Sequence, residues 1–146
     1  MHKYHISYEE FHDHTLDLYE KVKHLNLDYI VGPSRGGLLP GVILSHKMNV
    51  PLVPVEWSTR DHGIKVSRLD VADDLREGKN ILLVDDINDT GKTLVDLIED
   101  WSYNTESKGT LTTASVFQRY TTSKPSDHFQ VLITDDTWLV FPYEAE

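Results

Sequence analysis

The sequence predicts an α/β fold in which a doubly wound, mostly parallel sheet is flanked by helices. Two observations predict it. Short apolar segments of strand length alternate along the chain with segments of helical periodicity, and the strongest apolar segment, Asn80–Val84, contains four consecutive apolar residues. Alternation of this kind favours a parallel sheet, and a continuous apolar run is typical of a strand that is covered on both faces.

The elements follow in order from local signals. Ser7 and Glu10 have the spacing of a capping box, which predicts a helix start, and Pro40 falls in the first turn of a helix, where proline is tolerated. The polar stretch 58–70 contains Gly63 and is expected to be an exposed loop or small flap. The expected helices are 7–25, 38–48 and 93–101, and the expected strands are 29–31, 52–57, 80–84, 111–117, 129–134 and 138–141.

Length and composition predict a single domain over residues 1–146, with no internal repeat. A net charge of −10 argues against a nucleic-acid-coating protein, because binding to the phosphate backbone needs a cationic face. No apolar run is long enough to span a membrane, and no signal peptide is evident, so a cytoplasmic location is expected. The absence of cysteine excludes thiol catalysis and disulfides, and no pair of histidines has zinc-site spacing.

The segment 81–94 carries the chemistry. A buried strand is expected to end in Asp85 and Asp86, and Asp89 follows in a tight loop. The residues 90–93 (Thr-Gly-Lys-Thr) then open a helix, whose free N–H groups form a phosphate cradle. Carboxylates beside a phosphate site suit ribose hydroxyls or a divalent cation that the phosphates share. The pattern therefore indicates a ligand that combines phosphate, sugar and metal.

This segment has three other interpretations. A nucleotide-binding P-loop needs a glycine five positions before Gly91, where Asp86 stands. A phospho-acceptor receiver domain carries its carboxylates after the first strand, whereas these follow at least two. An acidic turn that caps an ordinary helix is the remaining alternative.

The segment resembles the phosphoribosyl pyrophosphate motif of the type I phosphoribosyltransferases, in which two acidic and two variable residues precede Asp-Thr/Ser-Gly-x-Thr. The resemblance extends over about residues 29 to 142. The loop Ser34-Arg35-Gly36-Gly37 resembles the family's pyrophosphate-binding loop in the form typical of xanthine-guanine and related purine enzymes. It implies anion contacts from Arg35 and the loop N–H groups, and a cis non-proline peptide bond near Ser34–Arg35.

The C-terminal segment 135–142 resembles the base-binding end of the 6-oxopurine enzymes. The resemblance implies that Trp138 stacks on the purine and that backbone groups after it, from Leu139, contact the base edge; a core or interface tryptophan is the alternative. Arg119 occupies the position of a lysine that donates to the exocyclic oxygen of the base. Arginine and lysine are not equivalent donors, and a solvated loop arginine is the alternative.

The stretch 58–70 corresponds to the family's mobile hood. The resemblance implies that Arg60, Lys65 and Arg68 close over the pyrophosphate and exclude water.

The resemblance implies an activity. The expected protein is a glycosyltransferase of purine salvage that transfers ribose 5-phosphate from phosphoribosyl pyrophosphate to a 6-oxopurine, with release of pyrophosphate, Mg²⁺ as cofactor and assembly as a dimer or tetramer. In it Asp89 is the general acid/base, Asp85 and Asp86 contact the ribose and the metal, and the turn Thr90, Gly91, Lys92 and Thr93 holds the 5-phosphate. A non-catalytic nucleotide sensor and an enzyme for a non-purine base are the alternatives, and the choice among hypoxanthine, guanine and xanthine stays open.

Overall fold

A six-stranded sheet forms the centre of the protein. The computed structural model describes residues 2–57, 65–66, 69–104 and 106–144. The strand order is β4-β3-β2-β5-β6-β7, and every pair is parallel except β3 with β4, so the predicted fold class is confirmed. The strands are β2 (Tyr29–Ser34), β3 (Leu52–Trp57), β4 (Lys65–Val66), β5 (Asn80–Asn88), β6 (Thr110–Arg119) and β7 (His128–Ile133).

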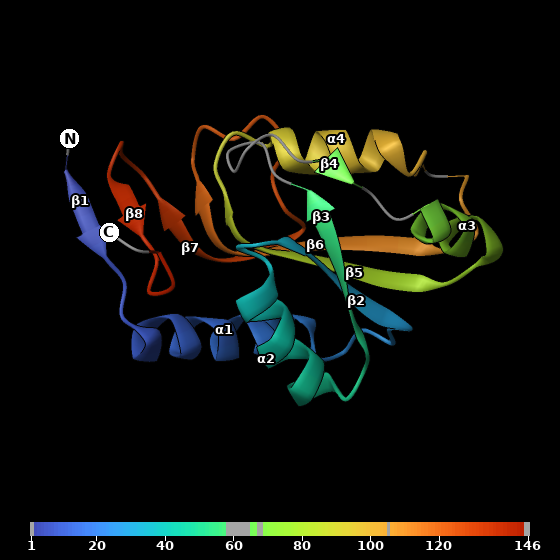
Figure 1. Cartoon of the computed structure of the whole chain (residues 1–146), viewed down its shortest axis with the longest axis horizontal. Coiled ribbons are helices and arrows are strands. Elements are labelled where there is room, and N and C mark those ends of the chain that lie inside the picture. Colours follow the sequence, from blue (N-terminus) through green and yellow to red (C-terminus); the bar gives the residue numbers. More distant parts are fainter. Residues whose placement is uncertain (1, 58–64, 67–68, 105, 145–146) are drawn as a thin grey trace.

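Helices cover both faces of the sheet. The helices α1 (Tyr8–Val22) and α2 (Leu38–Met48) lie on one face, and α3 (Leu69–Glu77) and α4 (Lys92–Asp100) lie on the other (Figure 1). In β5, Leu82 and Val84 pack with α1 and α2, whereas Ile81 and Leu83 pack with α3 and α4. All four are fully buried. This two-sided burial explains why the central strand is continuously apolar rather than alternating.

The N-terminal helix begins as its capping signal predicts, with one difference. The Glu10 backbone N–H donates to Ser7 Oγ at 3.0 Å. The Glu10 carboxylate, however, accepts from the hydroxyl of Tyr4 at 3.0 Å and 3.1 Å. The residues Phe11 and Leu18 are buried, as the helical periodicity requires. Tyr8, in the first turn of the helix, is 60% exposed.

Three short elements escape the sequence prediction. They are β1 (Lys3–His5), which pairs in parallel with β8 (Trp138–Val140), and β4 and α3, both of which begin inside the stretch 58–70 that was expected to be a loop. All three residues of β1 are exposed, so no apolar pattern marks the strand. The helix α3 is anchored by Val71 and Leu75 among acidic residues, which is too short a pattern to signal a helix.

The ends of several strands also differ from expectation. The strand β2 continues past Val31 to Ser34, so Ser34 is its last residue and not part of the loop after it. The strand β5 continues past Val84 to Asn88, so Asp85 and Asp86 lie within the strand and not in the turn after it. The strand β6 continues past Phe117, so Arg119 is its last residue. The hood residues Arg60 and Arg68 lie outside the described residues, and Lys65 is described only as backbone of β4.

Candidate active site

A pocket opens at the carboxyl ends of β2 and β5, the edge at which open parallel sheets bind ligands. It brings together the loop after β2, the acidic end of β5 and the first turn of α4. The residues that line it are Pro33, Ser34, Arg35, Gly36, Trp57, Asp85, Asp86, Ile87, Asn88, Asp89, Thr90, Gly91, Lys92, Thr93, Leu94, Ala114 and Ser126.

Most of the predicted site residues therefore lie around one cavity, and four do not. Gly37 is the N-cap of α2, behind the lining. Arg119 ends β6, and Trp138 and Leu139 begin β8; none of the three lines the pocket. Trp57, Asn88, Ala114 and Ser126 line it without having been predicted, because no local motif marks them.

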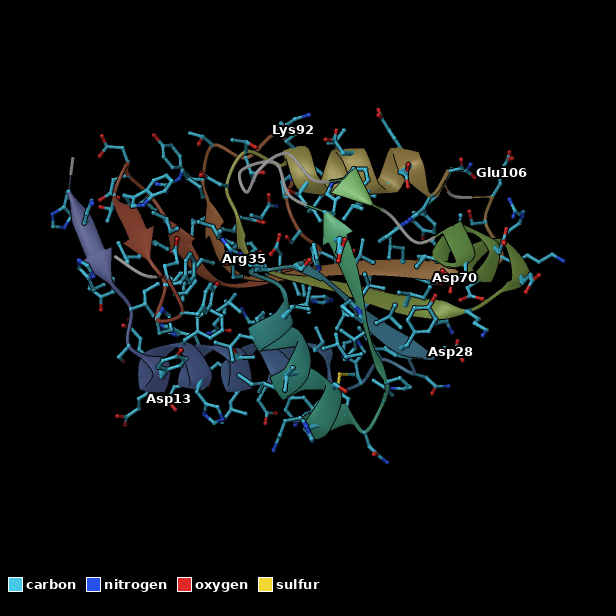
Figure 2. The ribbon with its side chains drawn as sticks, viewed as in Figure 1. Asp13, Asp28, Arg35, Asp70, Lys92 and Glu106 are labelled. Atoms are coloured by element: carbon cyan, nitrogen blue, oxygen red, sulfur yellow. The ribbon has the colours of Figure 1, made fainter. Side chains whose placement is uncertain are left out.

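The loop after β2 contains a cis peptide bond between Ser34 and Arg35, as the family resemblance implies. Ser34 Oγ donates to the carbonyl oxygen of Val55 on β3 at 3.2 Å. A Cβ atom at Gly36 would collide with the carboxylate of Asp86. Glycine at position 36 is thus required by the close approach of this loop to β5. Figure 2 labels Arg35 at the end of β2.

The carboxylate of Asp86 is buried, with 2% of the residue exposed. Its Oδ1 atom accepts from the Ile87 N–H at 2.7 Å, and its Oδ2 atom accepts from the hydroxyl of Tyr143. Burial, and then the negative charge of Asp86, raise the pKa of Tyr143, so the phenol stays protonated and donates. The neighbouring Asp85 is only half-buried, and its Oδ1 atom accepts from the Asp86 N–H at 2.9 Å.

The variant Tyr143→Phe is expected to lower the free energy of unfolding by about 1–3 kcal/mol, because the Oδ2 atom of the buried Asp86 carboxylate loses the donor that Tyr143 provides. The ring itself, which stacks on Phe141 at 5.6 Å, is retained. Denaturant unfolding measures the loss. Tyr120→Phe is the control, since Tyr120 is 59% exposed, and its effect is expected to stay within about 0.5 kcal/mol. Equal stability of the two variants would contradict the role of the Tyr143 hydroxyl.

The turn 90–93, which the sequence predicts to bind phosphate and which is called the phosphate turn below, contains Gly91, the N-cap of α4. The φ angle of Gly91 is +90°. A Cβ atom at this position would lie 2.7 Å from the backbone nitrogen of Lys124. The carbonyl oxygen of Thr90 accepts from both the N–H and the hydroxyl of Ser123, each at 2.9 Å. Thus the turn after β6 supports the phosphate turn from outside.

A buried amide connects that supporting turn to β5. Asn88 Nδ2 donates to the carbonyl oxygen of Lys124 at 2.8 Å and to Ser126 Oγ at 3.2 Å, while Asn88 Oδ1 accepts from Thr122 at 3.0 Å. Gln118 on β6 completes the network by accepting from the Ser126 N–H at 2.7 Å. Buried polar groups that are satisfied in this way hold the backbone in one arrangement.

Lys92 contributes to the phosphate turn differently from what its motif suggests. Its ammonium group pairs with Asp96 one helical turn later, at 2.9 Å, and its side chain is 57% exposed. Figure 2 labels it at the start of α4. The part of Lys92 that belongs to the turn is its backbone N–H, which donates to Thr90 Oγ1 at 3.2 Å.

The side chains of Asp89 and Arg119 form an ion pair. Arg119 Nε donates to Asp89 Oδ1 at 2.6 Å, Nη1 donates to the carbonyl oxygen of Asp135 at 2.7 Å, and Nη2 donates to that of Thr137 at 3.0 Å. The Arg119 side chain is only 12% exposed, so it is not a solvated loop arginine. Asp89 is more accessible, at 39%.

The residues expected to contact the base lie beyond this ion pair. Trp138 is half-buried at the start of β8, and its backbone N–H donates to the carbonyl oxygen of His2 at 2.8 Å. The side chain of Leu139 is buried in the same core cluster as α1 and α2. Arg119 connects β8 to the pocket, because it contacts both the turn 135–137 that precedes Trp138 and Asp89, which lines the pocket.

The acids of the pocket suit a cation that is shared with a ligand. Within the described ranges, no three histidine or acidic side chains converge as a metal site of their own. Asp85 and Asp86 do line the same pocket, and Mg²⁺ is usually bound by one or two carboxylates together with the phosphates of a substrate. The residues present therefore fit Mg²⁺.

This sheet, with a phosphate turn after its central strand, has the architecture of the phosphoribosyl transferase domain. The chain belongs to that family, whose model matches residues 7–145. Membership indicates an enzyme of the glycosyltransferase type. In the described part of the chain every helix is too short or too polar to cross a lipid bilayer.

The chain resembles enzymes for two kinds of base. It is 29% identical to the xanthine-guanine phosphoribosyltransferase of Idiomarina loihiensis over 144 residues, 95% of this chain and 85% of that protein. It is 35% identical to the orotate phosphoribosyltransferase of Brucella ovis, but over 86 residues, 56% of this chain and 41% of that protein. The structure of the purine phosphoribosyltransferase from Pyrococcus horikoshii superimposes with a TM-score of 0.78 at 29% identity, covering 100% of this chain and 97% of that one.

Proposed function

We propose that the protein transfers ribose 5-phosphate from phosphoribosyl pyrophosphate to a 6-oxopurine base and releases pyrophosphate. The observation that carries the proposal is the single pocket that combines the loop after β2, the acids of β5 and the phosphate turn. A purine is favoured over orotate because the similarity to the xanthine-guanine enzyme spans 95% of the chain, against 56% for the orotate enzyme. The proposal includes purine salvage, a cytoplasmic location and a homo-oligomer.

The phosphates would bind at two places. The turn Thr90–Thr93 opens α4 and would hold the 5-phosphate, since a helix N-terminus combines N–H donors with a favourable dipole. The pyrophosphate would bind at Ser34, Arg35, Gly36 and Gly37, where a guanidinium forks onto phosphate oxygens. This local positive potential is needed in a chain with a net charge of −10.

Asp85 and Asp86 would contact the ribose hydroxyls and hold Mg²⁺. When bound, Mg²⁺ supplies charge neutralisation to the pyrophosphate leaving group. Asp85 is the more accessible of the two carboxylates, and the Oδ2 atom of Asp86 is occupied by Tyr143. Asp85 is therefore the principal ligand in this proposal, and Asp86 supports it.

Asp89 would act as the general base. A purine ring nitrogen attacks the anomeric carbon, the bond from that carbon to the pyrophosphate oxygen breaks, and the proton on the purine passes to Asp89. Its Oδ1 atom is held by Arg119, which leaves Oδ2 to accept the proton. Trp138 would stack on the base and the backbone at Leu139 would contact its edge.

A panel of bases tests the proposal. The protein, phosphoribosyl pyrophosphate and Mg²⁺ are incubated with hypoxanthine, guanine, xanthine, adenine, orotate or uracil, and nucleotide and pyrophosphate are measured. We expect product with at least one 6-oxopurine and none with orotate or uracil. Product with orotate alone would overturn the choice of purine. Binding of phosphoribosyl pyrophosphate without product from any base would support a non-catalytic sensor instead.

A further inference from the structure

We infer that Arg119 is a positioning residue, which holds Asp89 in register with the turn that precedes Trp138, and that it does not donate to the base. The inference rests on the proposed function for its meaning in catalysis. It assigns to this chain a role for Arg119 that differs from that of the lysine whose position it occupies.

The geometry of the guanidinium carries the inference. Its Nε, Nη1 and Nη2 atoms each donate to a different acceptor, namely Asp89 Oδ1 at 2.6 Å, the Asp135 carbonyl at 2.7 Å and the Thr137 carbonyl at 3.0 Å. The three acceptors belong to two segments of the chain that are 46 positions or more apart, between residues 89 and 135. With 12% of its side chain exposed, Arg119 is enclosed by these partners.

The turn that accepts these hydrogen bonds is itself ordered. Asp135 Oδ1 accepts from the Thr137 N–H at 3.0 Å. That backbone hydrogen bond is the largest cause that lowers the pKa of Asp135, and the charge of Arg119 adds to it. The side chain of Asp135 thus closes the turn, and its carbonyl group remains available to Arg119. The backbone N–H of the next residue, Trp138, donates to the carbonyl oxygen of His2, which directly precedes β1.

A lysine cannot replace this arrangement. A guanidinium spreads five N–H donors over three nitrogens in a fixed planar fork, whereas an ammonium group carries its three donors on one nitrogen at the end of a flexible chain. A single nitrogen at position 119 does not reproduce the fork that reaches Asp89, the Asp135 carbonyl and the Thr137 carbonyl together, so we expect lysine to release the turn 135–137. The variant Arg119→Lys therefore separates a positioning role from a base-contacting role.

The experiment compares Arg119→Lys, Arg119→Gln, Asp89→Asn and the double variant Arg119→Gln/Asp89→Asn by kcat and by KM for each substrate. We expect both Arg119 variants to lower kcat about tenfold or more, with KM for phosphoribosyl pyrophosphate within about twofold of wild type. In the Asp89→Asn background, Arg119→Gln is expected to lower kcat less than about twofold further, because it acts through Asp89.

Arg76→Lys is the matched control, since Arg76 pairs with Asp73 on the surface of α3 and its side chain is 70% exposed. It is expected to leave kcat and KM unchanged. A kcat for Arg119→Lys within about twofold of wild type, with a lower KM for the base, would overturn the inference in favour of a donor to the base. An undiminished loss from Arg119→Gln in the Asp89→Asn background would also overturn it.

Thermal unfolding of the wild type, Arg119→Gln, Asp89→Asn and the double variant tests the inference without substrates. If Arg119 and Asp89 act as one unit, the fall in Tm of the double variant is smaller than the sum of the two single falls; additive falls would contradict the pairing. This measurement distinguishes the two proposals. A wild-type protein that makes no nucleotide refutes the proposed function, whereas the Tm cycle still decides whether Arg119 holds Asp89.

Discussion

Replacing Asp89 with asparagine is expected to lower kcat by about 10²- to 10⁴-fold, the range typical of losing a general acid or base. The amide keeps the size of the side chain and still offers Oδ1 to Arg119 Nε, so the ion pair becomes a hydrogen bond and the local backbone is retained. What is lost is the oxygen atom that takes the proton from the base in the proposed reaction. Steady-state kinetics at saturating phosphoribosyl pyrophosphate measure the effect.

Asp73→Asn controls for the loss of one carboxylate. Asp73 is 58% exposed on α3 and pairs across the surface with Arg76, so its replacement is expected to leave kcat unchanged. A kcat for Asp89→Asn within about twofold of wild type would remove Asp89 from the proton transfer. The proton transfer would then have to be carried by another group.

The variant Gly91→Ala is expected to disable the phosphate turn. A left-handed backbone costs an L-residue about 1–2 kcal/mol, and the new Cβ atom would meet the backbone nitrogen of Lys124 at 2.7 Å. Overpacking of this kind adds about 1–3 kcal/mol. Since the turn has to move to relieve the collision, KM for phosphoribosyl pyrophosphate is expected to rise about tenfold or more.

Gly78→Ala provides a matched control. Gly78 also has a positive φ, +111°, but the nearest atom to a Cβ there is Lys108 Cβ at 3.9 Å. This variant carries the backbone penalty without the collision and lies outside the pocket lining. It is expected to reduce stability by about 1–2 kcal/mol and to leave KM unchanged. Identical behaviour of the two variants in unfolding and in kinetics would show that the turn 122–124 does not constrain Gly91.

The sequence predicted the parts of the fold that bury a recognisable pattern. The helix Leu38–Met48 and the strand Leu52–Trp57 have the predicted bounds, and the central strand was identified from its apolar run. The strand Lys3–His5 was missed because it is held by backbone pairing with Trp138–Val140 and buries none of its own side chains. Pairing between segments so far apart has no signature in a single sequence.

In the candidate site, too, the parts with a local sequence motif were predicted and the contacts between distant residues were not. The loop after β2 and the turn 90–93 were predicted because each is a continuous sequence motif. The partners of the acids were not predicted. Tyr143 meets Asp86 across 57 positions, and the interaction of Arg119 with Asp89 spans 30 positions. Such contacts arise only when the fold places β5 beside β6 and brings Tyr143 of the C-terminal segment against Asp86 of β5.

The pairing of β1 with β8 places both ends of the described chain together, at the far edge of the molecule from α3 (Figure 1). A sheet of two short strands has little stability of its own, and this one includes Trp138. A change in the first few residues, such as a fused peptide, is therefore expected to displace Trp138, the residue proposed to stack on the base. It is expected to leave the proposed binding sites for the ribose and the phosphates unchanged. Affinity for the nucleobase and affinity for the ribosyl donor are thus separable by changes at the N-terminus.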